Sequence, residues 1–342
     1  MKIEDERKNF LLGKKIPLYL ILTFSAAAIY GLNYTFKYFH AEEPAKVAQA
    51  DVKCVSPLNI IRENDYKFTR PLLLADVKGE DRKYDVIKKQ VNDYVESFIK
   101  TKVIETASVY YCALDDNSQF SINKDEKYHP TDMLAVAKMI ALLKQSERNA
   151  ELLDKKVLYT KQVPIPKQDK AAACLENNKM FTIRSLMYSM FACNDDNATI
   201  ALNPYVDSSV LKNLYSSIQE PFPGVNDRDY MTAIYDYTRL LKVLYTAGYL
   251  TEAHSEFALE LMTNTSFHDG ILKHIGKDAK VVHYYAENEV AAAMEVHEFA
   301  IIYLKNKPYI ISIMSKGGDK KNLSVLLSNI SKMIYDSMNK IS

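Results

Sequence analysis

The order of strand and helix signals along the chain is the feature that most restricts its fold. Strand-like alternation occurs in two parts of the sequence, and a long run of helical patterns separates them. The predicted strands are Ala107–Leu114, Gln119–Ile122, Lys280–Glu287, Met294–Leu304 and Tyr309–Met314. Strands that need partners to bury their apolar faces then form one antiparallel sheet, built from both ends of the domain.

The helical patterns give the rest of the predicted architecture. The predicted helices are Tyr84–Lys100, Met133–Lys144, Thr182–Ala192, Tyr205–Ser217, Met231–Ala247, Glu252–Met262 and Leu323–Met338. The first and last of these flank the sheet, and the middle ones form an inserted helical lobe. The predicted fold class is therefore α/β of the α+β type. Ligand sites favour the seam between two such parts.

An uncharged run near the N-terminus predicts a transmembrane helix. The 21 residues Ile16–Phe36 carry no charge, which is long enough to cross a bilayer. Lys14 and Lys15 precede the run, and Lys37 is the only basic residue close behind it. The positive-inside rule then places the N-terminus in the cytoplasm. A cleaved signal peptide, with its cleavage site in the small residues 25–28, is the alternative.

These signals divide the chain into four predicted segments. Residues 1–15 form a cytoplasmic tail, 16–36 a single-pass membrane anchor, 37–55 a polar linker, and 56–342 an extracytoplasmic domain. The 44 basic and 43 acidic residues nearly balance, so there is no electrostatic reason to expect a nucleic-acid partner. Of the four cysteines, Cys174 and Cys193 could pair outside the cytoplasm, although buried thiols are the simpler interpretation.

The segment Tyr128–Val136 (YHPTDMLAV) has the frame of a serine acyl-enzyme site. It resembles the Pro-x-Ser-x-x-Lys helix start of the class A β-lactamase-like and penicillin-binding serine hydrolases. In that family the serine attacks a carbonyl, and the lysine one turn later helps to remove its proton. Asp132 stands at the serine position here and Ala135 at the lysine position. The resemblance extends from about residue 66 to the C-terminus and implies the fold, but not the activity.

The other motifs of that family are also altered. Its Ser-Asp-Asn motif corresponds to Asn194, Asp195 and Asp196, so only the central aspartate is kept. Its Lys-Thr-Gly motif on the edge of the sheet corresponds to Tyr284, Tyr285 and Ala286, so none of the three is kept. The alignment implies that Asp132, Asp195 and Asp196 converge in a cleft, which would then repel anionic ligands. The alternative is that these aspartates cap helices and face water.

Four other patterns could carry chemistry, and each has a plainer interpretation. Asp132 could act as a nucleophile, but a helix cap is the ordinary role of such an aspartate. Ser121–Lys124 and Ser337–Lys340 spell Ser-x-x-Lys without the helix-start context. Lys316-Gly317-Gly318 imitates Lys-Thr-Gly but is predicted to be a turn after the last strand.

The histidines offer a weak metal hypothesis. His283 and His297 could face each other across a hairpin, but no third ligand is evident. No metal and no cofactor is therefore expected.

The leading functional hypothesis is a membrane-anchored pseudoenzyme that binds or scaffolds an envelope protein or a cell-wall partner. The alternative is a divergent serine hydrolase, of the β-lactamase or D-Ala-D-Ala peptidase type, with displaced catalytic groups. A third hypothesis is a structural spacer in an envelope assembly.

Overall fold

The computed structural model describes the following residues: 58–63, 71–77, 79–130, 133–163, 175–223, 230–290, 293–304 and 307–341. They all belong to one of two compact units, Ser56–Ser342. The predicted tail, anchor and linker lie outside the described residues, as do Asp132 and Cys174. Within the described ranges, no helix has the length and apolar content needed to span a bilayer.

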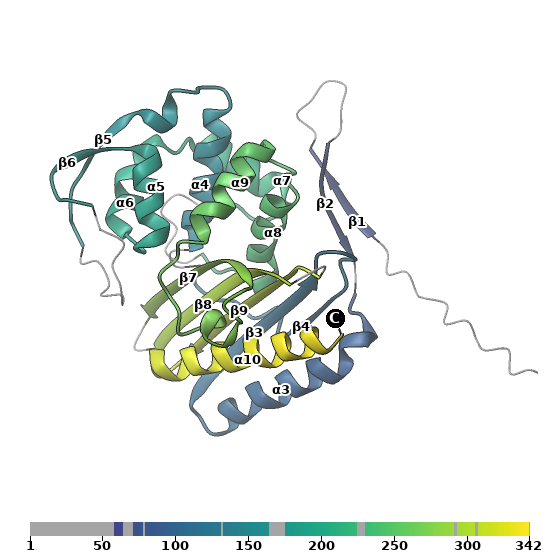
Figure 1. Cartoon of the computed structure of the whole chain (residues 1–342). Coiled ribbons are helices and arrows are strands. Elements are labelled where there is room, and N and C mark those ends of the chain that lie inside the picture. The colour runs from purple at the N-terminus through teal and green to yellow at the C-terminus, as the bar shows by residue number, and fades with distance from the viewer. Residues whose placement is uncertain are drawn as a thin grey trace, which may run out of the picture. The chain divides into compact units, whose positions relative to one another are not determined.

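A five-stranded antiparallel sheet in the order β4-β3-β9-β8-β7 is the centre of this unit. Its strands come from both ends of the unit, as the sequence predicts. The strands are β3 (Ile104–Ala113), β4 (Gln119–Ile122), β7 (Lys280–Val290), β8 (Ala293–Tyr303) and β9 (Tyr309–Gly317). The first and last helices, α3 (Asp85–Lys100) and α10 (Lys320–Ile341), lie side by side along one face of the sheet (Figure 1).

The helical block between β4 and β7 covers the other face of the sheet (Figure 1). Its helices are α4 (Leu134–Ser146), α5 (Ile183–Ala192), α6 (Asp196–Leu202), α7 (Ser208–Ser217), α8 (Ile234–Tyr245) and α9 (Glu252–Met262). Short 3₁₀ helices occur at Arg82–Tyr84, Leu152–Asp154, Asn203–Tyr205 and Ile271–His274. The two faces of the sheet therefore bury two separate apolar cores, one against α3 and α10 and one against the helical block.

Two small hairpins that the sequence reasoning missed complete the unit. β1 (Leu58–Arg62) pairs with β2 (Leu72–Val77), and β5 (Lys156–Tyr159) pairs with β6 (Lys179–Thr182). Each strand is four to six residues long, so its alternation is too brief to stand out.

Side-chain caps explain where several helices begin. Thr182 accepts a hydrogen bond from the Ser185 backbone at the start of α5, and Thr251 does the same for His254 at the start of α9. Asp207 caps α7. The helix predicted from Tyr205 therefore begins only at Ser208, because residues 203–205 form a separate 3₁₀ turn.

The prediction that Lys316-Gly317-Gly318 forms a turn is wrong for its first two residues. Lys316 and Gly317 still belong to β9, opposite Glu295 and Met294 of β8. The Lys316 ammonium forms an ion pair with Glu105 at 3.2 Å. A strand that continues past its apolar run is not visible in the alternation of side chains.

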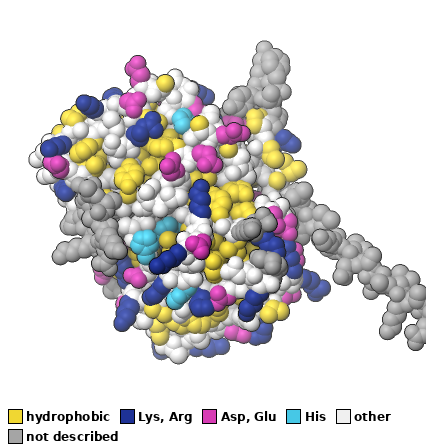
Figure 2. All heavy atoms as spheres, viewed as in Figure 1, with side chains coloured by type: hydrophobic (Ala, Val, Ile, Leu, Met, Phe, Trp, Pro, Cys, Tyr) yellow, Lys and Arg dark blue, Asp and Glu magenta, His cyan; other side chains and the backbone are white. Residues whose placement is uncertain are grey.

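Charges of both signs are mixed on the face of the molecule that Figure 2 shows. Figure 2 shows Lys and Arg side chains interspersed with Asp and Glu side chains over the face in view. Large apolar side chains are exposed on the β1–β2 hairpin at Ile60 and Leu72 and on the β5–β6 hairpin at Leu158 and Met180.

Candidate functional site

The edge strand β7 and the connection from α5 to α6 meet at one place. The Tyr284 hydroxyl lies 3.5 Å from the side-chain oxygen of Asn194, although the two residues are 90 positions apart. Asn194 follows the end of α5 with a φ of 47°, in the left-handed region that asparagine tolerates better than most residues. The structure thus brings together one residue from the Ser-Asp-Asn position and one from the Lys-Thr-Gly position.

Aromatic side chains fill this meeting point. Tyr284 is 1% exposed, and its ring lies 4.9 Å from that of Phe191 and 6.1 Å from that of Phe299, measured between centroids. Ala286 on the same strand and Ala135 in the first turn of α4 are also buried in the same core. The described positions here therefore line a packed interior, in which edge-to-face rings are a favourable arrangement.

Asp195 is turned into the helical block. Its carboxylate accepts hydrogen bonds at 2.8 Å from the Tyr159 hydroxyl and at 2.8 Å from the Ser189 hydroxyl. It also caps α6 by accepting from the backbone N–H groups of Asn197 and Ala198. Asp195 is 1% exposed, whereas Asp196 is half-buried in the first turn of α6. The lone pairs of the Asp195 carboxylate are thus used within the fold.

Tyr285 belongs to the opposite face of the sheet. Its side chain packs in the core against α3 and α10, where its ring stacks on Phe267 at 3.7 Å. Alternation along a strand separates Tyr285 from Tyr284 and Ala286. The three residues of this motif position therefore do not share one site.

The histidine pair predicted from the sequence does not form. His283 is opposite Ala300 and His297 is opposite Ala286, so the two imidazoles lie on opposite faces of the sheet. His283 is hydrogen-bonded to the buried Glu298 at 2.9 Å. The described residues contain no group of three or more His, Cys, Asp or Glu side chains placed to hold a metal ion.

A second histidine cluster, missed from the sequence, holds the segment before α4. Glu295 accepts from the backbone N–H of His129 at 3.0 Å and contacts the His129 ring nitrogen at 3.1 Å. The His297 Nε2 lies 3.1 Å from the His129 carbonyl, and its Nδ1 accepts from the Ser315 backbone N–H. Because Nδ1 is an acceptor, the proton of neutral His297 sits on Nε2.

Glu295 is fully buried in this cluster. Burial alone would raise the pKa of its carboxyl, but hydrogen bonds from His297 and His129 outweigh it and lower the pKa. The alternation of Glu295 and His297 along β8 is the one sequence signal that could have suggested the cluster.

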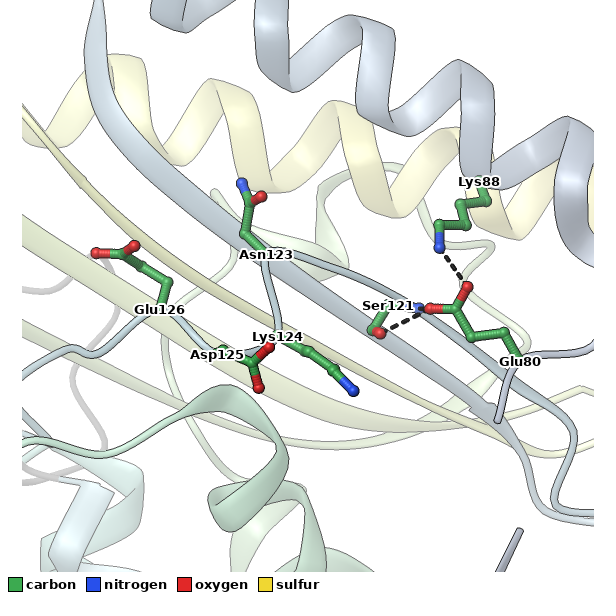
Figure 3. Close-up of a pocket in the computed structure, with 7 residues that line it drawn as sticks. All are labelled: Glu80, Lys88, Ser121, Asn123, Lys124, Asp125 and Glu126. Atoms are coloured by element: carbon green, nitrogen blue, oxygen red, sulfur yellow. Dashed lines mark hydrogen bonds and ion pairs between the residues drawn. The ribbon is translucent and has the colours of Figure 1, made fainter. Parts of the chain in front are cut away.

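Two adjoining open cavities lie at the other edge of the sheet, along β4. One has a volume of about 350 Å³ between β4 and the start of α8, and it adjoins a more open one of about 510 Å³. They share Glu80, Ser121, Lys124 and Asp125, and we refer to the pair as the β4 groove. Figure 3 shows the Glu80 carboxylate between the Lys88 ammonium and the Ser121 hydroxyl.

The two cysteines within the described residues, Cys112 and Cys193, are buried. Burial raises the pKa of the Cys112 thiol, although Lys242 and Tyr110 act in the opposite direction. A buried thiol with a raised pKa is a poor nucleophile.

Comparisons with solved structures show which proteins share this architecture. The penicillin-binding protein PBP-A aligns with a TM-score of 0.60 and 15% identity, covering 75% of this chain and 96% of its own. The TLA-3 extended-spectrum β-lactamase aligns with a TM-score of 0.62 and 17% identity, covering 73% and 98%. A β-lactamase from Francisella tularensis aligns with a TM-score of 0.59 and 16% identity, covering 74% and 100%.

Identities this low establish the shared fold and say nothing of activity. No curated protein matches the chain by sequence. The sequence profile described as the Beta-lactamase enzyme family matches residues 87–338, well over half of the chain. The α+β fold and the resemblance inferred from the motif frame are thereby confirmed, and the chain belongs to the beta-lactamase enzyme family.

Proposed function

We propose that the chain is a non-catalytic member of this family, a binding or scaffold protein of the cell envelope. The observation that carries the proposal is the buried Tyr284 ring, which packs between Phe191 and Phe299 at the sheet edge. Acyl transfer needs space there for a carbonyl, beside a nucleophile and its base. A packed aromatic core offers no such space.

The side chains around this point also lack the required chemistry. Ala135 cannot act as a base, and Tyr284 replaces a cationic side chain with a neutral one. The Asp195 carboxylate is saturated by Tyr159, Ser189 and the N-terminus of α6, so it is not poised to take a proton from a substrate.

The charge balance supports the same conclusion for ligands. Relative to the family pattern, Ala135 and Tyr284 remove two positive charges, while Asp132 and Asp196 add two negative ones. Like charges a few ångströms apart repel each other by roughly 1–4 kcal/mol in partly solvated settings. We therefore expect penicillins and peptides that end in D-alanine to be rejected at this position.

The proposed location rests on the sequence of the N-terminal segment. Ile16–Phe36 would anchor the chain in a membrane, with Lys14 and Lys15 on the cytoplasmic side and the domain outside. Protease added to cells with a permeable outer layer should digest the domain and spare the tail. Protection of the whole chain would refute the topology, and release of a soluble mature form would indicate a cleaved signal instead.

Labelling with a fluorescent penicillin tests the absence of catalysis. The purified full-length chain, incubated alongside PBP-A as a positive control, should show no fluorescent band after denaturing electrophoresis. PBP-A is a suitable control because a variant of it has been solved as an acyl-enzyme complex with penicillin G. A covalent label on this chain would overturn the proposal, and mass spectrometry would then identify the residue.

The alternative, a hydrolase with displaced catalytic groups, would draw on Ser121. This serine lies in the open β4 groove, and its hydroxyl donates to the Glu80 carboxylate at 2.8 Å. Hydrogen bonds from Lys88 and Ser121 outweigh the effect of burial and lower the pKa of Glu80. A carboxylate with a lowered pKa is a weak base, so this arrangement is poorly suited to activating a hydroxyl.

A further inference from the structure

The β4 groove combines an aromatic wall with a mouth that carries charges of both signs. The half-buried ring of Tyr235 forms the wall, and the ring of Tyr110, which is only 2% exposed, packs edge to face against it at 5.5 Å between centroids. The enclosed part of the groove has a volume of about 350 Å³, at the lower end of the range for small-ligand sites. The groove lies at the opposite edge of the sheet from β7 and is therefore separate from the meeting point of Tyr284 and Asn194.

Buried ionic groups hold this wall in place from behind. The Tyr235 hydroxyl donates to Asp76 at 2.8 Å, and the Lys242 ammonium donates to Asp76 at 2.8 Å and to the Tyr110 hydroxyl at 3.1 Å. Asp76 is 1% exposed and Lys242 is 3% exposed. Burying the two charges costs desolvation free energy, and apolar side chains in their place would stabilise the fold as well or better. A rigid, preorganised wall is the benefit that such an arrangement gives to a binding site.

The charges at the mouth differ in whether they already have partners. Lys127 pairs with Asp236 at 3.5 Å, and Glu80 pairs with Lys88. Within the described ranges, Lys124 and Asp125 form no hydrogen bond or ion pair with another side chain. Figure 3 shows both side chains extending on the same side of the strand end, with Asn123 pointing away from them. One cation and one anion therefore remain available at the mouth of the groove.

We propose that the β4 groove binds short zwitterionic peptides. The terminal carboxylate of the ligand meets Lys124, its terminal ammonium meets Asp125, and its backbone lies against the ring of Tyr235. Glu126 at the open end adds a second negative charge on the ammonium side. A ligand with a single charge would leave one of the two side chains without a partner.

Saturation-transfer NMR on the full-length chain in detergent micelles, with triglycine as the probe, tests this proposal. Triglycine should give a saturable signal with a Kd in the millimolar range. N-acetyl-triglycine and triglycine amide, which each lack one terminal charge, should bind about fivefold more weakly, since one exposed ion pair contributes about 1 kcal/mol.

Two variants test the recognition of each end of the ligand separately. Lys124→Ala should bind triglycine and its amide equally but still discriminate against the N-acetyl form, and Asp125→Ala should show the reverse. Lys321→Ala, which removes an exposed lysine on α10, is the matched control and should behave as the parent chain. Absence of saturation transfer, equal binding of all three peptides, or equal effects of all three variants would overturn the proposal.

Discussion

Substitution of Tyr284 distinguishes a packed core at β7 from an open catalytic cleft. Tyr284→Phe removes only a hydroxyl whose hydrogen bond to Asn194 is long, at 3.5 Å, so it should lower the free energy of unfolding by less than about 1 kcal/mol. Tyr284→Ala removes a ring that is 1% exposed and packed against Phe191 and Phe299. Large-to-small changes of this kind cost about 3–5 kcal/mol.

Tyr284→Lys is the decisive member of the series, because it restores the residue type of the active relatives. The ammonium would enter a core in which Tyr284 packs against aromatic and aliphatic side chains. An unpaired charge in such a place costs several kcal/mol or loses its proton. We expect Tyr284→Lys to destabilise the chain at least as much as Tyr284→Ala.

Urea unfolding followed by tyrosine fluorescence suits this series, because the chain has 24 tyrosines and no tryptophan. Thermal unfolding should show Tyr284→Ala and Tyr284→Lys about 10 °C below the parent, at about 2–4 °C per kcal/mol for a domain of this size. If Tyr284→Lys were as stable as the parent, the ammonium would have reached water. The conclusion that side chains fill the catalytic position at β7 would then be wrong.

Three further predictions follow from single groups. Lys242→Met should lower the free energy of unfolding by about 3 kcal/mol because it leaves Asp76 buried with one ion partner fewer, and adding Asp76→Asn should recover most of the loss in a double-mutant cycle. Burial and the nearby Asp236 charge raise the pKa of Glu220 from 4.5 to about 8, so the folded state binds its proton more tightly. The stability that this group contributes is therefore lost as pH rises from about 4.5 to 8, and Glu220→Gln should flatten the profile of unfolding free energy against pH over that window. Asp132→Ser alone should give no hydrolysis of a chromogenic β-lactam, since Ala135 provides no base and members of a catalytic unit act together.

The elements predicted best from the sequence are those with long, regular patterns and a visible cap. Glu252–Met262 has the bounds of α9, and Thr251 before it is a readable cap. Seven-residue α6 was missed because it spans only two turns, although Asp195 at its start is a typical capping residue. A short element is stabilised mainly by its tertiary contacts, which alternation along the chain does not reveal.

The sequence predicted where the candidate site lies, but not which side chains fill it. The motif frame pointed to Asn194 and Tyr284, and the structure brings these two residues together. That the Tyr284 ring is buried between two phenylalanines depends on Phe191 and Phe299, which lie on other elements. The contact between His129 and Glu295 joins residues 166 positions apart, so no local pattern could have predicted it.

Asp195 shows how a position aligned with a family motif can become part of the framework of the fold. Its carboxylate ties Tyr159 of β5 and Ser189 of α5 to the start of α6, with both hydroxyls at 2.8 Å. Asp195→Ala would leave two buried hydroxyls and the helix N-terminus without an acceptor. This change should lower the free energy of unfolding by about 3 kcal/mol or more. Asp195→Asn keeps the size of the side chain and one acceptor oxygen, so it should lower the free energy of unfolding by less. Its main effect is to replace hydrogen bonds to a charged oxygen by weaker ones to a neutral oxygen. Urea unfolding of both variants measures the difference, with Asp196→Ala, on a half-buried neighbour, as the control. Equal stability of Asp195→Ala and the parent chain would mean that the carboxylate is not needed by the fold, and its retention would then require a functional explanation.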